Sequence, residues 1–256
     1  MTLQSNVKPD EKKKEGWGEA IRTVIYAVAI ALVIRSLAYE PFNIPSGSML
    51  PTLLIGDYLF VSKYPYGYSR HSFPFSPPVM EGRVWESPVE RGDIVVFKLP
   101  RDNSTDYIKR IVGLPGDKLQ VSNGLLLING KPVQREFMGN AVVEGEDRRG
   151  PVRKFRETLP NGRSYITLDL YDNSDGDNTE VFTVPAEHYF AMGDNRDNSS
   201  DSRFAPERGG VGYIPAENLV GRAEFRFFSI SGDARFWEVW KWPSAIRFSR
   251  IFTSVD

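Results

Sequence analysis

The chain has 256 residues, of which 32 are basic and 33 acidic, and its formal net charge at pH 7 is −1. This length can bury a substantial core, in one large domain or two smaller ones. The balanced charge lacks the basic excess expected of a nucleic-acid-binding protein, so we expect no nucleic-acid partner. The absence of cysteine excludes disulfides, thiol nucleophiles and cysteine-ligated metals.

Histidine is nearly as scarce as cysteine. His71 and His188 are the only two histidines, so any catalytic triad or histidine metal site has to use one of them. Neither lies in an H-E-x-x-H or H-x-E pattern, and we expect both to be structural or exposed. We therefore expect neither a metal site nor a cofactor.

The first expected element is the apolar segment 17–39, WGEAIRTVIYAVAIALVIRSLAY. Only twelve uncharged residues separate Arg22 from Arg35, which is short for a membrane span. Arginines that snorkel to the headgroups and flanking aromatic rings extend the feasible span to the full segment, roughly 34 Å at the α-helical rise. We therefore predict a single transmembrane anchor over 17–39.

The orientation of this anchor follows from its flanks. Residues 1–16 form a short polar tail that contains four lysines, so the positive-inside rule predicts a cytoplasmic N-terminus and an external remainder. The alternative is a cleaved signal peptide, because Ser36-Leu37-Ala38 has the small-x-small pattern of a cleavage site. A retained anchor is favoured, since cleavage there would leave the serine motif discussed below close to a new N-terminus.

Beyond residue 40 the sequence predicts a mainly β fold. Short alternating or β-branched runs are separated by Gly, Pro and Asn-Gly turn signals, while helical periodicity is nearly absent, which favours an antiparallel architecture. The proline-rich stretch 65–88 is expected to be a long loop or extended arm. The expected strands are 58–61, 93–97, 107–112, 125–128, 165–168, 180–184 and 188–192.

A charged, glycine-spotted segment at 133–184 separates two blocks of sharper motif, and we expect it to be an inserted, smaller β subdomain. It divides the main β domain into a first part, 40–132, and a second part, 185–232. The final segment, 233–256, contains three of the five tryptophans. Such an amphipathic tail suits a membrane interface, although ordinary packing against the domain explains it equally well.

Three motifs carry chemically useful side chains. NIPSGSML, which begins at Asn43, is typical of a turn but also supplies hydroxyl groups. YIKRIVGLPGD is an alternating strand in which Tyr107 or Ile108 can line a pocket while Lys109 points to one face, although a strand lysine is usually exposed. GDNRDNSSDSR, from Gly193, predicts an ordered polar loop, because a calcium loop would need a glycine at its sixth position.

Taken in chain order, PSGSM, RGDIVVFKLP, YIKRIVGLPGD and GDNRDNSSDSR resemble the successive motifs of the type I signal peptidases, the bacterial leader peptidases. The resemblance covers residues 17–120 and 185–222 and includes the apolar segment before the first motif. Residues 133–180 match only as the place where the family carries a variable second β domain. A lone PSGS is a weak signal, whereas four motifs in the family's order are specific.

The resemblance implies a serine endopeptidase with a Ser–Lys dyad, a variant of the triad mechanism. By motif position, Ser48 is the implied nucleophile and Lys109 the implied general base. A lysine with its ordinary pKa of about 10.4 is a poor base near neutrality, but burial against apolar neighbours disfavours its charged form. An apolar setting for Lys109 is therefore a requirement of the mechanism.

The remaining roles carry over from the family in the same way. The Ser46 hydroxyl and the Ser48 backbone N–H are the implied oxyanion hole. Ser199 corresponds to the serine that orients the base, and Asp201 and Arg203 to a supporting ion pair. The positions at which the family lines its small substrate pockets are Phe42, Ile44, Met49, Leu53, Tyr107 and Ile108.

The implied substrate is an exported preprotein, bound as an extended strand and cut after a small-x-small site typified by Ala-x-Ala. The implied location is the bacterial cytoplasmic (inner) membrane, with a single span, a cytoplasmic N-terminus and the catalytic domain on the outer, periplasmic side. The lipid bilayer is then a second partner.

Two other readings compete with this one. Self-cleaving repressors also use a Ser–Lys dyad on a related β scaffold, but their DNA-binding half is missing, and the hydrophobic N-terminal segment and neutral charge argue against them. A membrane-anchored β protein that binds peptides without catalysis would be recognised by the loss of Ser48 or Lys109. Both residues are present.

Overall fold

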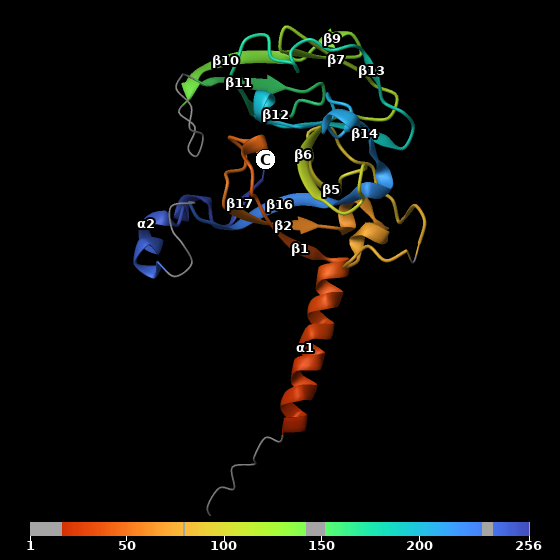
Figure 1. The fold of residues 1–256 in the computed structure, drawn as a ribbon, viewed down its shortest axis with the longest axis vertical. Helices are drawn as coiled ribbons and strands as arrows, with labels where there is room; N and C mark the ends of the chain where they lie inside the picture. The colour runs from red at the N-terminus through yellow and green to blue at the C-terminus, as the bar shows by residue number, and fades with distance from the viewer. Residues whose placement is uncertain (1–16, 79, 142–151, 232–237, 256) are drawn as a thin grey trace, which may run out of the picture.

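The computed structural model describes residues 17–78, 80–141, 152–231 and 238–255. A single long helix, α1 (Trp17–Leu37), projects from a body built of β-strands (Figure 1). The predicted tail at 1–16 lies outside the described residues, as do 233–237 and 256 of the tryptophan-rich tail. The predicted mainly β fold with an N-terminal apolar helix is confirmed.

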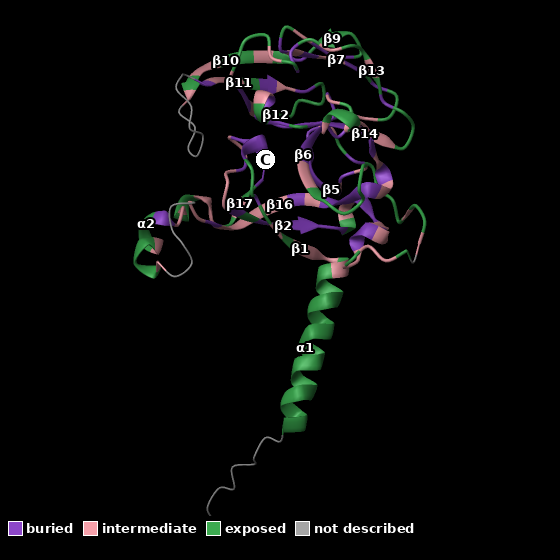
Figure 2. Cartoon of the chain, viewed as in Figure 1, coloured by how far each residue is buried: buried purple, intermediate pink, exposed green. Residues whose placement is uncertain are grey.

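Helix α1 is apolar and uncovered. None of its residues is buried, and it is drawn as exposed along its length in Figure 2. The helix has 21 residues and contains an 18-residue stretch with a mean hydropathy of 1.9, so it is long and apolar enough to cross a membrane. A helix that is apolar all round needs a non-aqueous environment on every side. It ends at Leu37, short of the predicted end at 39, because Tyr39 already pairs with Ser62 in a sheet.

The main sheet has the strand order β1-β2-β16-β5-β6-β14-β15, and β17 pairs with β16 beside this path. The pairs are antiparallel, and β6 pairs with β14 across the whole inserted segment. Residues before and after the insertion therefore form one sheet. Its strands are β1 (Tyr39–Asn43), β2 (Asp57–Ser62), β5 (Ile94–Lys98), β6 (Asp106–Gly113), β14 (His188–Met192), β15 (Ile214–Pro215), β16 (Leu219–Ser229) and β17 (Thr253–Ser254).

The centre of this sheet is buried on both faces. Along β5, Val95 and Phe97 belong to one hydrophobic cluster while Ile94 and Val96 belong to another. Successive side chains of a strand point to opposite faces, so a continuous apolar run is what a strand covered on both sides requires. This double burial gives the neighbouring β6, which carries Lys109, a rigid support.

Two smaller sheets lie beyond the main sheet, at the far side of the body from α1 (Figure 1). One has the order β13-β7-β8-β9 and includes strands that precede residue 133, so the strand pairing of this region starts before the predicted boundary of the insertion. The strands are β7 (Lys118–Ser122), β8 (Leu125–Ile128), β9 (Lys131–Pro132) and β13 (Phe182–Thr183) in this sheet, and β10 (Gln134–Ala141), β11 (Val152–Thr158) and β12 (Ser164–Asp169) in the other.

Two Asn-Gly pairs explain the tight turns of the first small sheet. Asn123-Gly124 joins β7 to β8 and Asn129-Gly130 joins β8 to β9, and all four residues have positive φ. Two-residue hairpin loops favour this mirror-image turn because its twist matches that of the strands, and Asn and Gly tolerate positive φ best.

The predicted long loop at 65–88 contains short elements, among them β3 (Tyr68–Ser69) and β4 (Arg83–Val84), which pair with each other. In the C-terminal tail, α2 (Trp242–Ala245) is a single short turn. Arg250 pairs with the buried Asp57 of β2, and Val255 is buried. The tail thus packs on the domain, yet it also leaves large apolar side chains exposed, namely Val239, Trp240, Phe248 and Phe252.

A buried ion pair joins the three-stranded sheet to the polar loop of the last motif. Glu157 of β11 accepts hydrogen bonds from Arg196 at 2.8 and 2.5 Å, and their side chains are 1% and 4% exposed. Tyr165 also donates to Glu157, at 3.0 Å. Charges this deeply buried depend on each other, because neither can be solvated once its partner is gone.

We predict that Glu157→Ala lowers the free energy of unfolding by about 3–5 kcal/mol, since it leaves Arg196 charged and buried. The matched control is Glu136→Ala in β10, whose ion pair with Arg156 is exposed and contributes less than about 1 kcal/mol. Urea unfolding in detergent, followed by tryptophan fluorescence, measures both. Equal effects of the two substitutions would contradict the structural role of the buried pair.

Candidate active site

Ser48 lies in a 3-10 turn, Gly47–Met49, in the connection between β1 and β2. The base of this connection is closed by hydrogen bonds from the Ile44 N–H to the Asp57 carbonyl at 2.9 Å and from the Gly56 N–H to the Ile44 carbonyl at 3.0 Å. Met49 and Leu53 are fully buried and hold the turn against the core. Two apolar residues thus fix a loop that the Pro-Ser-Gly-Ser pattern alone would leave mobile.

Lys109 of β6 meets this turn. Its Nζ lies 2.8 Å from the Ser48 Oγ and donates a second hydrogen bond to the Ile108 carbonyl at 2.9 Å. Lys109 is only 3% exposed and Ser48 8%. The Tyr107 ring lies on the same side, with its centroid 5.2 Å from Nζ. The two residues implied as the dyad, 61 positions apart, are therefore in direct contact.

Burial changes the chemistry of this lysine. Desolvation lowers the pKa of Lys109 to about 8, although the negative charges of Asp201 and Asp194 act in the opposite direction. An amine with a pKa of about 8 is neutral in about one molecule in ten at pH 7, against fewer than about one in a thousand for an ordinary lysine, and the neutral form can accept a proton. The neighbouring carboxylates keep the value from falling further.

Asn195 is a residue that the sequence analysis placed in the polar loop without a role. Its backbone N–H donates to the Ser48 carbonyl at 3.1 Å, and its side-chain Nδ2 donates to the Gly47 carbonyl at 3.0 Å. Asn195 thus holds two consecutive carbonyls of the Gly47–Met49 turn. Its only sequence signal was its position in a motif dense in hydrogen-bonding side chains.

Asp194, next to Asn195, connects both halves of the dyad. It forms a bidentate ion pair with Arg110, the residue after Lys109, and both N···O distances are 2.8 Å. Thr52, four residues after Ser48, donates to the same carboxylate at 2.5 Å. A bidentate buried pair fixes orientation as well as distance. One dipeptide therefore sets the position of the strand and of the turn.

Ser199 makes no hydrogen bond to Ser48 or Lys109. Its Oγ is buried and makes no hydrogen bond within the part of the chain that the structure describes. A Cβ at Gly193 would lie 2.2 Å from this Oγ and 2.5 Å from the Ser48 carbonyl, so only glycine lets the three segments meet. The implied hydrogen bond from Ser199 to the base is not formed here, and a base-orienting role for Ser199 stays a prediction.

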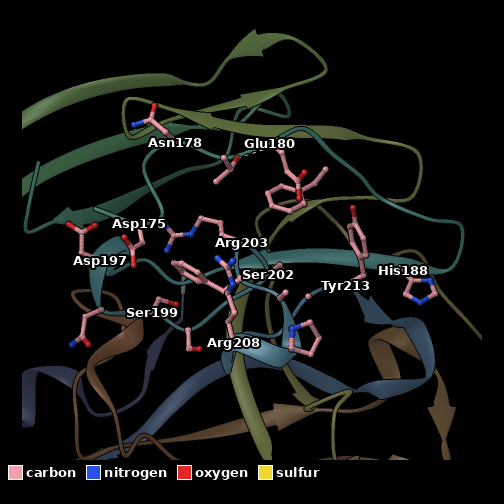
Figure 3. A pocket seen from close by; sticks show the side chains of 18 residues that line it. Asp175, Asn178, Glu180, His188, Asp197, Ser199, Ser202, Arg203, Arg208 and Tyr213 are labelled. Carbon is pink, nitrogen blue, oxygen red and sulfur yellow. Dashed lines mark hydrogen bonds between the residues drawn. The ribbon is translucent and has the colours of Figure 1, made fainter. Parts of the chain in front are cut away.

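Ser199 also lines a cleft of about 1280 Å³ between the polar loop and the segment that leads to β13 (Figure 3). Ser48 and Lys109 are not among its lining residues. Arg203 is the other implied site residue that lines the cleft. His188 lies at its other end.

Asp201 and Arg203 form the expected kind of pair in the structure. Arg203 donates to both oxygens of Asp201 at 2.9 Å, and both residues are buried. The Gly193 N–H donates to the same carboxylate at 3.0 Å. Although burial opposes it, these partners hold the pKa of Asp201 below its ordinary value. The pair thus orders the loop that carries Asn195 and Ser199.

The six implied substrate-pocket residues divide between two hydrophobic clusters. Five of them share the cluster that includes Met49, the residue after Ser48: Phe42, Ile44, Met49, Leu53 and Ile108. Tyr107 packs instead on the cluster that contains Phe97, and the centroids of the Tyr107 and Phe97 rings are 6.1 Å apart. It borders the site through Lys109 and not through the shared cluster.

Ser46 and the two histidines complete the comparison with the expected site. Ser46 precedes the 3-10 turn and is exposed. His71 is buried beside Ser76, and burial lowers its pKa to about 4. His188 is half-buried, with its Nδ1 2.8 Å from the Ala186 carbonyl. The side-chain hydrogen bonds of both histidines thus lie within their own segments.

Comparison with known proteins places the chain in a family. The sequence model described as "Signal peptidase, peptidase S26" matches residues 17–228. Signal peptidase I of Rickettsia typhi (strain ATCC VR-144 / Wilmington) is 43% identical over 249 residues, which cover 90% of each chain. Signal peptidase I of Rickettsia canadensis (strain McKiel) is 38% identical over 275 residues, covering all of this chain and 98% of the relative. The chain belongs to the S26 family of signal peptidases.

Among solved structures, a signal peptidase I from Enterococcus faecalis V583 is 23% identical and covers 53% of this chain and 97% of its own. The TM-score is 0.31. A score this low does not establish a shared overall arrangement.

Proposed function

We propose that this protein is a membrane-anchored serine endopeptidase that removes N-terminal signal peptides from exported preproteins, with Ser48 as nucleophile and Lys109 as general base. The observation that carries the proposal is the 2.8 Å contact between the buried Lys109 Nζ and the Ser48 Oγ. Membership of the S26 family and relatives named signal peptidase I support the substrate class.

In the acylation step, the Ser48 Oγ attacks the scissile carbonyl while Lys109 Nζ accepts the Oγ proton. The carbonyl π electrons move to oxygen and form a tetrahedral oxyanion. When this intermediate collapses, the C–N bond breaks and Lys109 returns the proton to the departing amine. Lys109 then deprotonates a water that attacks the ester carbonyl, and the released Ser48 oxygen recovers a proton.

The oxyanion is assigned to the N-terminal end of the 3-10 turn. The first N–H groups of a helical turn have no partner within it, so the Ser48 N–H is available to a developing negative charge. The Ser46 hydroxyl precedes the turn and is the second proposed donor. The two hydrogen bonds from Asn195 to the Gly47 and Ser48 carbonyls, which we call the Asn195 clamp, support this role because they hold the peptide groups on either side of Ser48.

Specificity for small side chains is proposed to follow from the packing beside the dyad. Ile44, Met49 and Leu53 are almost completely buried, so little space is left there for a substrate side chain. A pocket that holds only a methyl group accepts alanine and rejects larger residues by overlap. A site after Ala-x-Ala fits this requirement.

The setting at a membrane rests on the uncovered helix α1 and on the tail. The lysines of residues 1–16 support a cytoplasmic N-terminus and an external catalytic domain, and membership of the signal peptidase family supports a place at the bacterial inner membrane. Trp240, Phe248 and Phe252 are exposed on the tail and suit the interface between headgroups and acyl chains.

The dyad is tested with a quenched peptide that contains Ala-x-Ala, assayed with the full chain in detergent. Ser48→Ala and Lys109→Ala each remove one reacting group, and we expect the rate to fall by at least about 10³-fold. Lys109→Arg should be equally inactive, because a guanidinium does not give up its proton. Substantial turnover by any of the three variants would disprove the mechanism.

A second prediction concerns the clamp. Asn195→Ala leaves the Gly47 carbonyl without its side-chain donor, and we expect kcat to fall about tenfold with little change in KM, since a displaced nucleophile affects the transition state more than substrate binding. The control is Asn140→Ala at an exposed position of β10. A change confined to KM, or an unchanged kcat, would contradict a positioning role for Asn195.

A further inference from the structure

The junction between α1 and the main sheet has no linker. The helix ends at Leu37 and β1 begins at Tyr39, so a single residue separates them. The Ala38 N–H still donates to the helix, at the Ile34 carbonyl, while the Ala38 carbonyl accepts from the Lys63 N–H at 3.0 Å. The same residue thus belongs to the hydrogen-bond systems of both elements.

Side chains from three elements close around this point. Tyr68 of β3 donates its hydroxyl to the Leu37 carbonyl at 2.7 Å and so satisfies one of the orphan carbonyls at the helix end. Glu40 of β1 pairs with Arg35 of α1 at 2.5 Å and with Lys63 at 2.8 Å. We call this set, Arg35, Glu40, Lys63 and Tyr68, the anchor junction.

The anchor junction combines an exposed helix residue, Arg35, whose side chain is 54% exposed, with an ion pair on the sheet side that is buried. Lys63 is 1% exposed and also donates to the Ser72 carbonyl, and the Glu40 side chain is 12% exposed. Burial lowers the pKa of Lys63, while Glu40 favours its charged form. A buried ammonium paired with one carboxylate resists displacement, since moving either group exposes the other to an uncompensated desolvation cost.

The strand that leaves this junction leads directly to the nucleophile turn. β1 contributes five residues, or about 17 Å at the rise of an extended strand, and Ile44 then enters the closed base of the Ser48 connection. Residues 39–44 are thus fixed by hydrogen bonds to β2 and to the residue before it, and the Gly47 carbonyl is held by Asn195.

We propose that the anchor junction holds Ser48 at a fixed height above the bilayer and thereby sets the shortest spacing between a preprotein's apolar segment and its scissile bond that the enzyme can cut. The inference rests on the proposed signal-peptide-removing function. A bond that lies too close to the membrane cannot reach Ser48 unless the catalytic domain tilts down, and the junction opposes that tilt. Longer spacings are tolerated, because a flexible chain loops at little entropic cost.

The test uses the full chain reconstituted in phospholipid vesicles with substrates that share one apolar segment. A Gly-Ser spacer before the Ala-x-Ala site is lengthened in steps of about two residues, or about 7 Å of extended chain. For the wild type we expect cleavage to fall at least about tenfold below a threshold spacing, because the reacting atoms can no longer align.

Three variants loosen the junction to different degrees. Arg35→Gln removes the exposed half of the ion pair, Tyr68→Phe removes only the hydroxyl bonded to Leu37, and a Gly-Ser insertion after Leu37 separates the two elements. We expect each to move the threshold to shorter spacings, with the largest shift for the insertion. Arg101→Gln, at an exposed arginine outside the junction, is the matched control and should keep the wild-type threshold.

A short soluble Ala-x-Ala peptide without an apolar segment separates this inference from the proposed function. All variants should cut it at the wild-type rate, because the dyad is untouched. If the wild type does not cut it, the proposed function fails. If it is cut normally but the variants keep the wild-type threshold, or the wild type shows no threshold, the fixed-height inference is overturned.

Discussion

The burial of one lysine determines how the rest of this molecule is built. An ammonium group loses far more solvation on burial than any single contact restores, so Lys109 responds with a lowered pKa and the fold must stabilise the neutral form. This stabilisation comes from the main sheet, whose central strand, β5, is covered on both faces and supports β6. The same burial places the amine against Ser48 instead of water. A more polar or more open site would restore an ordinary lysine, which is no base at neutral pH.

Around this centre, charged groups act mainly by fixing geometry. Arg110–Asp194, Arg203–Asp201 and Arg196–Glu157 are all buried pairs, and they tie β6, the polar loop and the three-stranded sheet to one another. Buried pairs of this kind add little net stability compared with apolar packing, but breaking one is costly. They therefore suit a site whose reacting atoms must keep fixed relative positions. The anchor junction has a related arrangement at the other end of β1, where Glu40 pairs with the buried Lys63 and with Arg35 of α1.

Much of the fold could be predicted from the sequence, for identifiable reasons. Strands such as β5 and β8 are short apolar runs bounded by turn residues, and Asn-Gly marks two hairpins. The longest strand, β16, was missed because Arg and Glu alternate irregularly with its aromatic residues and bulges shift its register twice against β2. The predicted start of the insertion, residue 133, lies between β9 and β10 because the charged composition begins there. The pairing of β13 with β7 crosses this boundary, and composition does not reveal such a long-range contact. At the site, motifs indicated Ser48 and Lys109, but the clamp by Asn195 depends on a contact across 148 residues.

The central claim is that a neutral, buried Lys109 activates Ser48, and the pH dependence of kcat/KM for a short soluble Ala-x-Ala peptide tests it most directly. This ratio reports the free enzyme, in which the base must be unprotonated, so activity is lost as pH falls below the pKa of Lys109 and is complete above it. We expect a rising limb with a midpoint at about 8, with activity falling about tenfold for each pH unit below it. A midpoint near the ordinary lysine value of about 10.4, or a rate that does not change across this range, would contradict it.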